Sequence, residues 1–241
     1  MTLLRNAIFY PFVGLVVAAF QPAALLTRAW PALSWPLTRA YLSSLMWGLT
    51  HICNLRFEVR GMQNLPAGAC LIASGQQSTW ENVSFSLIFG NPAVLTKTEV
   101  YRTVTAGWVA RANDHIPIDR GGDLASLKAG IENARRQIAA GRSVLIFPEG
   151  TRNTVPGQAV LRKGVGVFYA VLDRPCVPVV LNSGQYWPYG TPLIRPGVIT
   201  VEVLEPIEPG LKWSAFEQRL KTVLDAGALR LADAARRPAA R

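Results

Sequence analysis

Charged residues, histidine and cysteine are all scarce in this chain. Of its 241 residues only 17% are charged and two are histidine, whereas 50% are hydrophobic. So few charges argue against a freely soluble domain of this size, since such domains carry about 25% charged residues. The composition predicts a protein that works at a membrane, and the length allows one α/β domain with a short additional segment.

Cysteine is represented by Cys53, Cys70 and Cys176, which are widely spaced and form no Cys-x-x-Cys pair. This odd number does not indicate a disulfide framework, and the sequence has no His/Cys/Asp cluster with metal-ligand spacing. We therefore expect reduced, buried thiols in a cytoplasmic domain. The sequence indicates neither a metal nor a cofactor.

Acidic residues are also few: 15 against 25 lysines and arginines, which gives a net charge of +10. Such a chain attracts anionic partners, whether nucleic acid, anionic lipid or a phosphorylated substrate. Basic charge combined with high hydrophobicity favours the lipid surface. We expect no nucleic-acid binding, because no basic segment is interleaved with aromatic residues that would stack on bases.

The N-terminal fifty residues are apolar enough to meet a membrane. Ala7–Leu26 carries no charge and is about as long as a bilayer span, although Pro11 and Pro22 predict a kinked or broken pair of helices. A second apolar stretch, Ala29–Thr50, contains three tryptophans, which are typical of the headgroup level. We expect membrane anchoring on the cytoplasmic face of the inner membrane; a true span and a cleaved signal peptide are the alternatives.

Beyond Thr50, short β-rich runs alternate with segments of helical periodicity. We predict strands at Arg56–Arg60, Ala69–Ser74, Ala93–Thr96, Ile116–Asp119, Ser143–Phe147, Val177–Leu181 and Val198–Leu204. We predict helices at Trp80–Phe89, Glu99–Ala110, Leu124–Ala140, Gly164–Leu172 and Ala215–Ala232. The alternation predicts an α/β fold with a mixed, mostly parallel sheet flanked by helices, and with an N-terminal hydrophobic two-helix membrane anchor. The expected division is an anchor at 1–50, an α/β domain at 51–232 and a basic tail at 233–241.

Polar residues gather in loops that follow predicted strands, where α/β sheets place their ligands. In the first of these loops Ser78 or Thr79 is suited to cap the next helix, and Glu81 lies where its charge favours the helix dipole. These residues alone favour a structural role. The second region contains Lys97 and, later in the chain, Arg120, which is followed by two glycines. This pattern fits either an arginine that approaches a phosphate or one that forms a surface ion pair.

The third loop is the most specific. A buried strand leads into the sequence Phe-Pro-Glu-Gly-Thr-Arg, which presents Glu149, Thr151 and Arg152 together. Gly150 permits close backbone approach, while the threonine and arginine offer donors to a phosphate. Lys163 follows and would add a second cation.

The loops resemble, in order and spacing, the four sequence blocks of the glycerolipid acyltransferase family over Arg56–Gly184. Phe147–Arg152 is identical to the third block of that family. Asn182–Pro188, after the last buried strand, is similar to the fourth block of bacterial lysophosphatidate acyltransferases, although by itself it also fits a simple strand terminus. The hydrophobic N-terminal helix pair is likewise a feature that the family would supply.

The first block departs from the family pattern, in which a histidine is followed after four residues by an acid. Glu81 stands at the position of the acid, and Gln76 stands at that of the histidine. In the family the histidine, oriented by the acid, takes the proton of a lysolipid hydroxyl as it attacks an acyl thioester. A glutamine amide has no basic lone pair at neutral pH, so Gln76 cannot act as that base.

The resemblance implies transfer of a fatty acyl group from acyl-CoA or acyl carrier protein to a lysophospholipid, most simply lysophosphatidate, in membrane phospholipid synthesis. Gln76 and Glu81 would mark the reaction centre. Glu149 would shape the third loop and orient its arginine. The residues that would surround the substrate phosphate are Lys97, Arg120, Glu149, Gly150, Thr151, Arg152 and Lys163.

Three explanations of Gln76 stay open: a substitution introduced to trap substrate, a natural relative that binds lipid without turnover, and slow catalysis through a water held by Glu81. A different lysolipid headgroup is also open. Neither histidine is expected to replace the missing base. His51 lies where the chain leaves the anchor, and His115 begins the strand towards Arg120, from which it should not return to the site.

Overall fold

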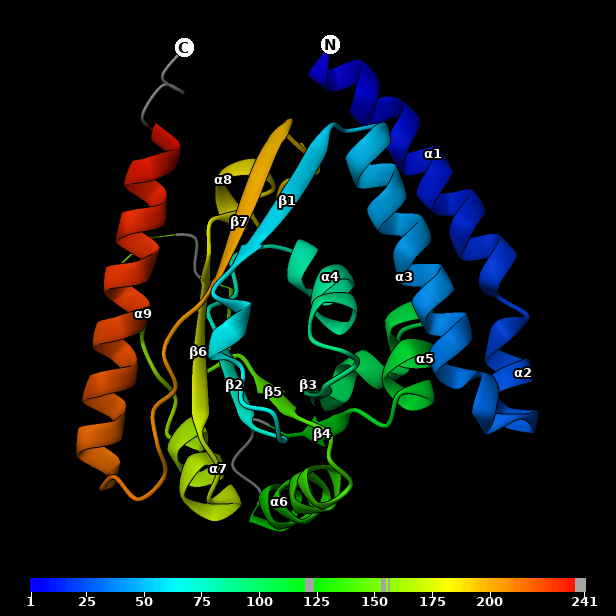
Figure 1. Ribbon diagram of the computed structural model, residues 1–241. Coiled ribbons are helices and arrows are strands. Elements are labelled where there is room, and N and C mark those ends of the chain that lie inside the picture. The colour runs from blue at the N-terminus through cyan, green and yellow to red at the C-terminus, as the bar shows by residue number, and fades with distance from the viewer. Residues whose placement is uncertain (120–123, 153–154, 156, 237–241) are drawn as a thin grey trace.

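Seven strands form one sheet in the computed structural model, which describes residues 1–119, 124–152, 155 and 157–236 (Figure 1). The strand order is β1-β7-β6-β2-β5-β3-β4. The strands are β1 (Leu55–Arg60), β2 (Leu71–Ser74), β3 (Ala93–Lys97), β4 (Ile116–Ile118), β5 (Val144–Ile146), β6 (Cys176–Leu181) and β7 (Gly197–Val203). Each overlaps a predicted strand, because short runs rich in Val, Ile and Leu bounded by turn residues fit a pleated, buried surface.

The sheet is mixed and mostly parallel, as predicted. Strands β6, β2, β5, β3 and β4 are parallel to one another, whereas β7 is antiparallel to β6, and β1 pairs parallel to β7. In β2, Leu71 is in register with Val144 of β5 and with Cys176 of β6. Parallel strands in register end at the same edge of a sheet, so the loops that follow β2, β5 and β6 meet there.

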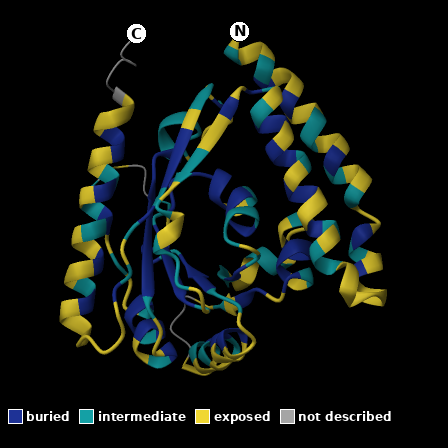
Figure 2. Ribbon diagram, viewed as in Figure 1, coloured by how far each residue is buried: buried dark blue, intermediate teal, exposed yellow. Residues whose placement is uncertain are grey.

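Helices cover both faces of the sheet. The helices of the α/β unit are α4 (Trp80–Ile88), α5 (Thr105–Ala112), α6 (Leu124–Ala139), α7 (Gly164–Leu172), α8 (Ser183–Tyr186) and α9 (Trp213–Arg236). Alternate side chains of β2 enter different cores: Leu71 packs with residues of α6, α7 and α9, and Ile72 packs with residues of α4 and the N-terminal helices. In Figure 2 the central strands are accordingly buried, and the outer side of α9 is exposed.

The N-terminal segment forms α1 (Thr2–Phe20), α2 (Ala23–Ala29) and α3 (Ser34–His51). The helix runs through Pro11 and breaks at Gln21 and Pro22. Within the described ranges, Thr2–Ala29 is the one helical stretch long and apolar enough to cross a membrane. The second helix of the expected anchor, α3, instead has a buried face that packs on the α/β unit. Large apolar side chains of the first stretch are exposed, among them Leu3, Leu4, Ile8, Leu15 and Leu25.

Hydrogen bonds as well as apolar contacts tie the N-terminal helices to the rest of the chain. The Asn6 side chain on α1 donates to the Ile194 carbonyl and accepts from the Ile194 backbone N–H, both at 2.9 Å. The Trp108 indole of α5 donates to Thr27 of α2 at 3.1 Å. The N-terminal segment therefore packs against the rest of the molecule. Figure 1 shows α1 and α3 side by side along one flank of the sheet.

One predicted helix is divided in two. The segment Glu99–Ala110 forms a 3₁₀ helix, Thr98–Arg102, followed by α5. The Thr103 hydroxyl accepts the Gly107 backbone N–H at 3.1 Å. A hydroxyl that satisfies a free N–H of the first helical turn favours the start of a helix, and α5 begins at Thr105. Gly107 lies so close to the Tyr101 carbonyl that a Cβ would approach its oxygen to 2.7 Å. The break turns the chain between β3 and α5 towards the N-terminal helices, which helical periodicity alone could not reveal.

Candidate active site

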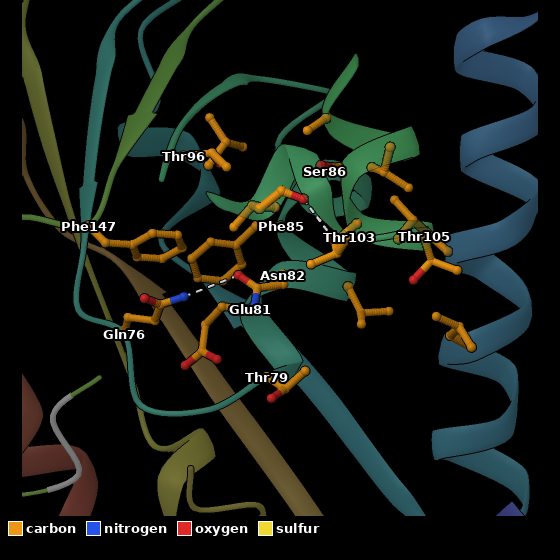
Figure 3. Close-up of a pocket in the computed structure, with 18 of the residues that line it drawn as sticks. Gln76, Thr79, Glu81, Asn82, Phe85, Ser86, Thr96, Thr103, Thr105 and Phe147 are labelled. Atoms are coloured by element: carbon orange, nitrogen blue, oxygen red, sulfur yellow. Dashed lines mark hydrogen bonds between the residues drawn. The ribbon is translucent and has the colours of Figure 1, made fainter. Parts of the chain in front are cut away.

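The first loop, after β2, presents Gln76 beside α4. The Gln76 side-chain Nε2 donates to the Asn82 Oδ1 at 3.1 Å, and Figure 3 shows this bond directly. The Gln76 Oε1 accepts no hydrogen bond from the described residues, so it can accept one from a ligand in the cavity. An amide oxygen cannot take up a proton at neutral pH. The site can therefore hold a substrate hydroxyl at Gln76 but cannot deprotonate it there.

Glu81 is buried at the first turn of α4, with 1% of its surface exposed. Its Oε1 accepts the backbone N–H of Gln77 at 3.0 Å and the hydroxyl of Ser183 at 2.6 Å. Both carboxylate oxygens also accept the Ser78 backbone N–H, at 3.1 and 3.2 Å. In Figure 3 the carboxylate points away from the Gln76–Asn82 bond. Glu81 thus fixes the first loop and joins it to the segment that follows β6.

Burial raises the pKa of Glu81 to about 7, and its hydrogen bonds from Ser183 and the loop backbone oppose that rise. Desolvation disfavours the charged form, whereas donors aimed at the carboxylate favour it. The group therefore changes charge near neutral pH. Such perturbed carboxyls are typical of functional sites.

The third loop begins at Phe147, directly after β5, and turns at Gly150, whose φ of +69° suits glycine. The Arg152 Nε donates to the Ser78 carbonyl at 3.2 Å. The guanidinium also lies over the ring of Tyr189, 4.3 Å from its centroid. Its two terminal nitrogens make no hydrogen bond to any residue of the described ranges, and they remain available to an anion.

The loops open into one cavity of about 580 Å³. Its polar lining includes six of the predicted site residues, Gln76, Glu81, Lys97, Gly150, Thr151 and Arg152. Its apolar lining comes from the N-terminal helices as well as the α/β unit, and the N-terminal helices contribute Phe9, Val13, Leu42, Leu45 and Leu49. One space thus joins a cationic, hydrogen-bonding region to an apolar region, which suits an amphipathic ligand with an anionic head.

Of the other predicted phosphate-site residues, neither Glu149 nor Lys163 lines this cavity. Glu149 instead lines a second, much smaller space, of about 20 Å³, beside Gly75 and Gln77. Lys163 directly precedes α7 and is not among the lining residues of the described chain. Arg120 lies outside the described residues.

His115 corrects one expectation from the sequence, because it lines the same cavity as Gln76. The reason is the parallel register of β4 with β3, which sets His115, directly before β4, beside the start of β3. Its Nδ1 accepts the Val94 backbone N–H at 3.2 Å, so the proton of the neutral ring is on Nε2. Burial lowers the pKa of His115 to about 3, so it is a poor base despite its position. His51, by contrast, is exposed and stacks on Trp47.

Three contributors were not predicted: Asn82, Ser183 and Tyr189. Asn82 follows the acid of the first block, and its link to Gln76 depends on the turn before α4. Ser183 and Tyr189 come from the segment after β6 and approach the other loops only because β6 lies next to β2. The polar run Asn182–Gln185 was a usable signal for Ser183, whereas nothing local distinguishes Tyr189.

Comparisons with known proteins agree with this geometry. A family model described as "Acyltransferase" matches residues 56–182. The chain is 33% identical over 158 residues to a 1-acyl-sn-glycerol-3-phosphate acyltransferase of Pseudomonas aeruginosa, covering 66% of this chain and 62% of that protein. It is 28% identical over 156 residues to human 1-acyl-sn-glycerol-3-phosphate acyltransferase beta, covering 64% and 56%. The alignments thus span less than two thirds of either relative.

The fold has a close counterpart among solved structures. The crystal structure of the 1-acyl-sn-glycerophosphate (LPA) acyltransferase PlsC from Thermotoga maritima superposes with a TM-score of 0.74 over 96% of this chain and 99% of that one, at 17% sequence identity. This match covers the N-terminal helices as well as the sheet. Because the family model also covers more than half of its length, the chain belongs to the acyltransferase family.

Proposed function

We propose that the chain binds a lysophosphatidate and an acyl thioester at the membrane, in a site built for acyl transfer to the free lysolipid hydroxyl. The observation that carries the proposal is the single cavity that joins Arg152 and Thr151 to the apolar side chains of α1 and α3. A cationic fork suits a phosphate, and an apolar wall suits a fatty acyl chain. The matched proteins named as 1-acyl-sn-glycerol-3-phosphate acyltransferases support the same substrate class.

In this proposal Arg152, Thr151 and Lys97 hold the glycerol phosphate, and the hydroxyl to be acylated lies against Gln76. Its oxygen attacks the thioester carbonyl, an ester C–O bond forms, the C–S bond breaks, and the hydroxyl proton passes to the thiol that leaves. Since Gln76 cannot take that proton, the transfer is slow or absent in this chain. General-base assistance is worth about 10²- to 10⁴-fold in rate.

Glu81 has room to orient a base if one is supplied. Its Oε1 accepts from Gln77, Ser78 and Ser183, while its Oε2 accepts only from Ser78 among the described residues. One lone pair of the Glu81 Oε2 is therefore available to accept the ring N–H of a histidine placed at position 76. The same lone pair could hold a water, which is the slow route that stays open for the chain as it is.

The organisation we propose assigns membrane attachment to residues 1–50, with the acyltransferase unit at 51–232 and a basic tail at 233–241. The exposed apolar side chains of α1 and the net charge of +10 support attachment to the anionic cytoplasmic face of the inner membrane. Either acyl-CoA or acyl carrier protein is the proposed donor. Lysophospholipid, acyl donor and membrane lipid are thus the proposed partners.

A Gln76→His variant tests the proposal. Full-length protein in detergent is given lysophosphatidate with radiolabelled acyl-CoA, and separately with acyl carrier protein as donor. We expect the histidine variant to form phosphatidate about 10²- to 10⁴-fold faster than the unchanged chain, because it gains a general base. Gln76→Asn is the matched control, since it keeps an amide and supplies no base.

A second candidate, a protein that binds the lipid without turnover, is favoured by Gln76 itself and by the occupied lone pair of His115. Lysophosphatidate binding measured on the same samples separates the two. Binding without turnover in any variant would support this second candidate. Absence of both binding and turnover would contradict the whole proposal.

A further inference from the structure

The segment that follows α8 places one aromatic ring against the candidate phosphate-binding arginine. The Arg152 guanidinium carbon lies 4.3 Å from the centroid of the Tyr189 ring, and both residues line the main cavity. At this distance the ring quadrupole attracts the cation, by about 0.5–1 kcal/mol where the pair is exposed and about 2 kcal/mol or more where it is desolvated. The contact places the charged end of Arg152 over the face of the ring.

The arginine is held at a second point, so its orientation is defined. Its Nε donates to the Ser78 carbonyl, and the Ser78 backbone N–H is in turn bound by the Glu81 carboxylate. With Nε occupied and one face covered by Tyr189, the edge that carries Nη1 and Nη2 is the part left for a ligand. That edge is the one that binds a phosphate through two parallel hydrogen bonds.

Tyr189 is itself fixed to the same loops and to α1. Its backbone N–H donates to the Gln77 carbonyl at 3.3 Å. Further along the segment, Ile194 is bonded to the Asn6 side chain of α1 at both its N–H and its carbonyl. Tyr189 is nonetheless 57% exposed as a residue, so it is not part of the core. Its contact with Arg152, and not packing in the core, therefore accounts for an aromatic residue at this position.

We propose that Tyr189 is a positioning residue for the anionic headgroup: its ring holds the Arg152 guanidinium in the plane in which the free edge grips a phosphate. The inference rests on the proposed function, because it takes Arg152 as the phosphate ligand. It goes further by assigning selectivity for a phosphate-bearing lysolipid to the ring of Tyr189. A lipid with the same acyl chain but no phosphate gains nothing from this arrangement.

The test compares binding of two lipids to the full-length chain in detergent by isothermal titration calorimetry. The probes are a short-chain lysophosphatidate and the monoacylglycerol with the same acyl chain. We expect Tyr189→Leu to weaken lysophosphatidate binding about 3- to 10-fold, as loss of a partly exposed cation–π contact implies. Tyr189→Phe, which keeps the ring, should bind within about twofold of the unchanged chain, and monoacylglycerol binding should not change.

A double-variant cycle with Arg152→Gln separates positioning from general structure. If Tyr189 acts through Arg152, Tyr189→Leu has no further effect once the arginine is gone. Equal loss for both lipids in Tyr189→Leu would indicate a structural role and overturn the inference. So would equal losses for Tyr189→Phe and Tyr189→Leu, because the hydroxyl and not the ring would then be responsible.

The same measurements distinguish failure of the inference from failure of the proposed function. If Arg152→Gln weakens lysophosphatidate binding while Tyr189→Leu does not, the phosphate site stands and the role of Tyr189 falls. If Arg152→Gln binds lysophosphatidate as well as the unchanged chain does, Arg152 is not the phosphate ligand. Both the phosphate assignment and the inference built on it then fall.

Discussion

Glu149 is a buried carboxyl whose surroundings do not favour its charge. Its Oε2 has no hydrogen-bond partner among the described residues, and a Cβ placed at Gly75 would lie 3.8 Å from its Oε1. Burial, together with the nearby Asp225 and Glu81, raises the pKa of Glu149 to about 7, and Lys221 opposes this rise. Such a group is neutral in the folded protein below pH 7 and charged above it.

The pH dependence of stability follows from this shift. Because the folded pKa lies above the unfolded value, the folded state binds more protons between about pH 4.5 and 7, and stability falls as pH rises through that window. We expect Glu149→Gln to raise the free energy of unfolding at pH 8 by about 1 kcal/mol, or about 2–4 °C in Tm. At pH 5.5 the gain should be smaller, because Glu149 is then neutral in the folded protein and only its ionisation in the unfolded chain lowers stability.

Thermal melts of the two proteins at pH 5.5 and pH 8 check this expectation. Glu132→Gln, an exposed carboxyl on α6, is the matched control and should leave Tm nearly unchanged at both values. A gain of equal size at both pH values would show that the charge of Glu149 is not the cause.

Ser183 controls the other buried carboxyl of the site. Its hydroxyl donates to the Glu81 Oε1 at 2.6 Å and lowers the pKa of that group against the larger effect of burial. In the Gln76→His background we expect Ser183→Ala to move the acid limb of the pH–rate profile to higher pH, because Glu81 would ionise later. Ser183→Thr, which keeps the hydroxyl, should move it less. An unchanged acid limb in Ser183→Ala would mean that Glu81 ionisation does not govern the rate.

At the scale of elements, α1 is bonded to the segment after α8 through a buried amide. Asn6 satisfies both the N–H and the carbonyl of Ile194, and the Tyr10 hydroxyl donates to the Pro192 carbonyl nearby. A buried backbone group left without a partner costs about 1–3 kcal/mol. This clamp therefore joins the apolar helix α1 to the segment that carries Tyr189.

We expect Asn6→Leu to lower the free energy of unfolding by about 1–3 kcal/mol, because leucine has a similar size but cannot satisfy Ile194. A thermal melt in detergent measures the loss. Leu3→Asn, an exposed position on the same helix, is the control for altered polarity on α1 and should have little effect. Equal Tm values for Asn6→Leu and the unchanged chain would show that the clamp does not stabilise the fold.

At the scale of the whole molecule, apolar surface and positive charge both favour a membrane. Leu3, Leu4 and Leu15 are among the most exposed large apolar residues, and the chain carries a net charge of +10. We expect Leu3→Asn, Leu4→Asn and Leu15→Asn together to reduce flotation with anionic vesicles at least tenfold, since each removes about 1 kcal/mol or more of apolar burial in lipid. Tm in detergent should stay unchanged, and binding to zwitterionic vesicles should be weaker from the start.

Flotation that survives this triple variant would show that α1 does not carry membrane attachment. If the protein floats with the vesicles at low salt but not at high salt, attraction between charges accounts for most of the attachment, because salt screens exposed charges.

The strands were predictable because each is a short apolar run bounded by turn residues, and such runs carry their own signal. Gln76, Glu81 and Arg152 were expected at one place because each follows a buried strand and because the resemblance to the acyltransferase blocks singled them out; all three line the same cavity. The division between the 3₁₀ helix Thr98–Arg102 and α5 was not, since a threonine hydroxyl and a close contact at Gly107 decide it. Whether a segment forms a helix or a strand thus depends largely on the residue pattern within it. Where the element begins and ends depends on particular contacts that the pattern does not reveal.

By itself the sequence determined the class of fold, the apolar character of the N-terminal helices and the identity of the loops that carry polar residues, because these depend on patterns within a few residues. Only the tertiary structure decided which side chains act on which. It bonded Gln76 to Asn82, brought Ser183 to Glu81 across 102 positions, and placed Tyr189 on Arg152. The reason is physical: the long-range pairs form between loops that meet at one edge of the sheet, and the strand order that brings those loops together is set by packing of the whole sheet.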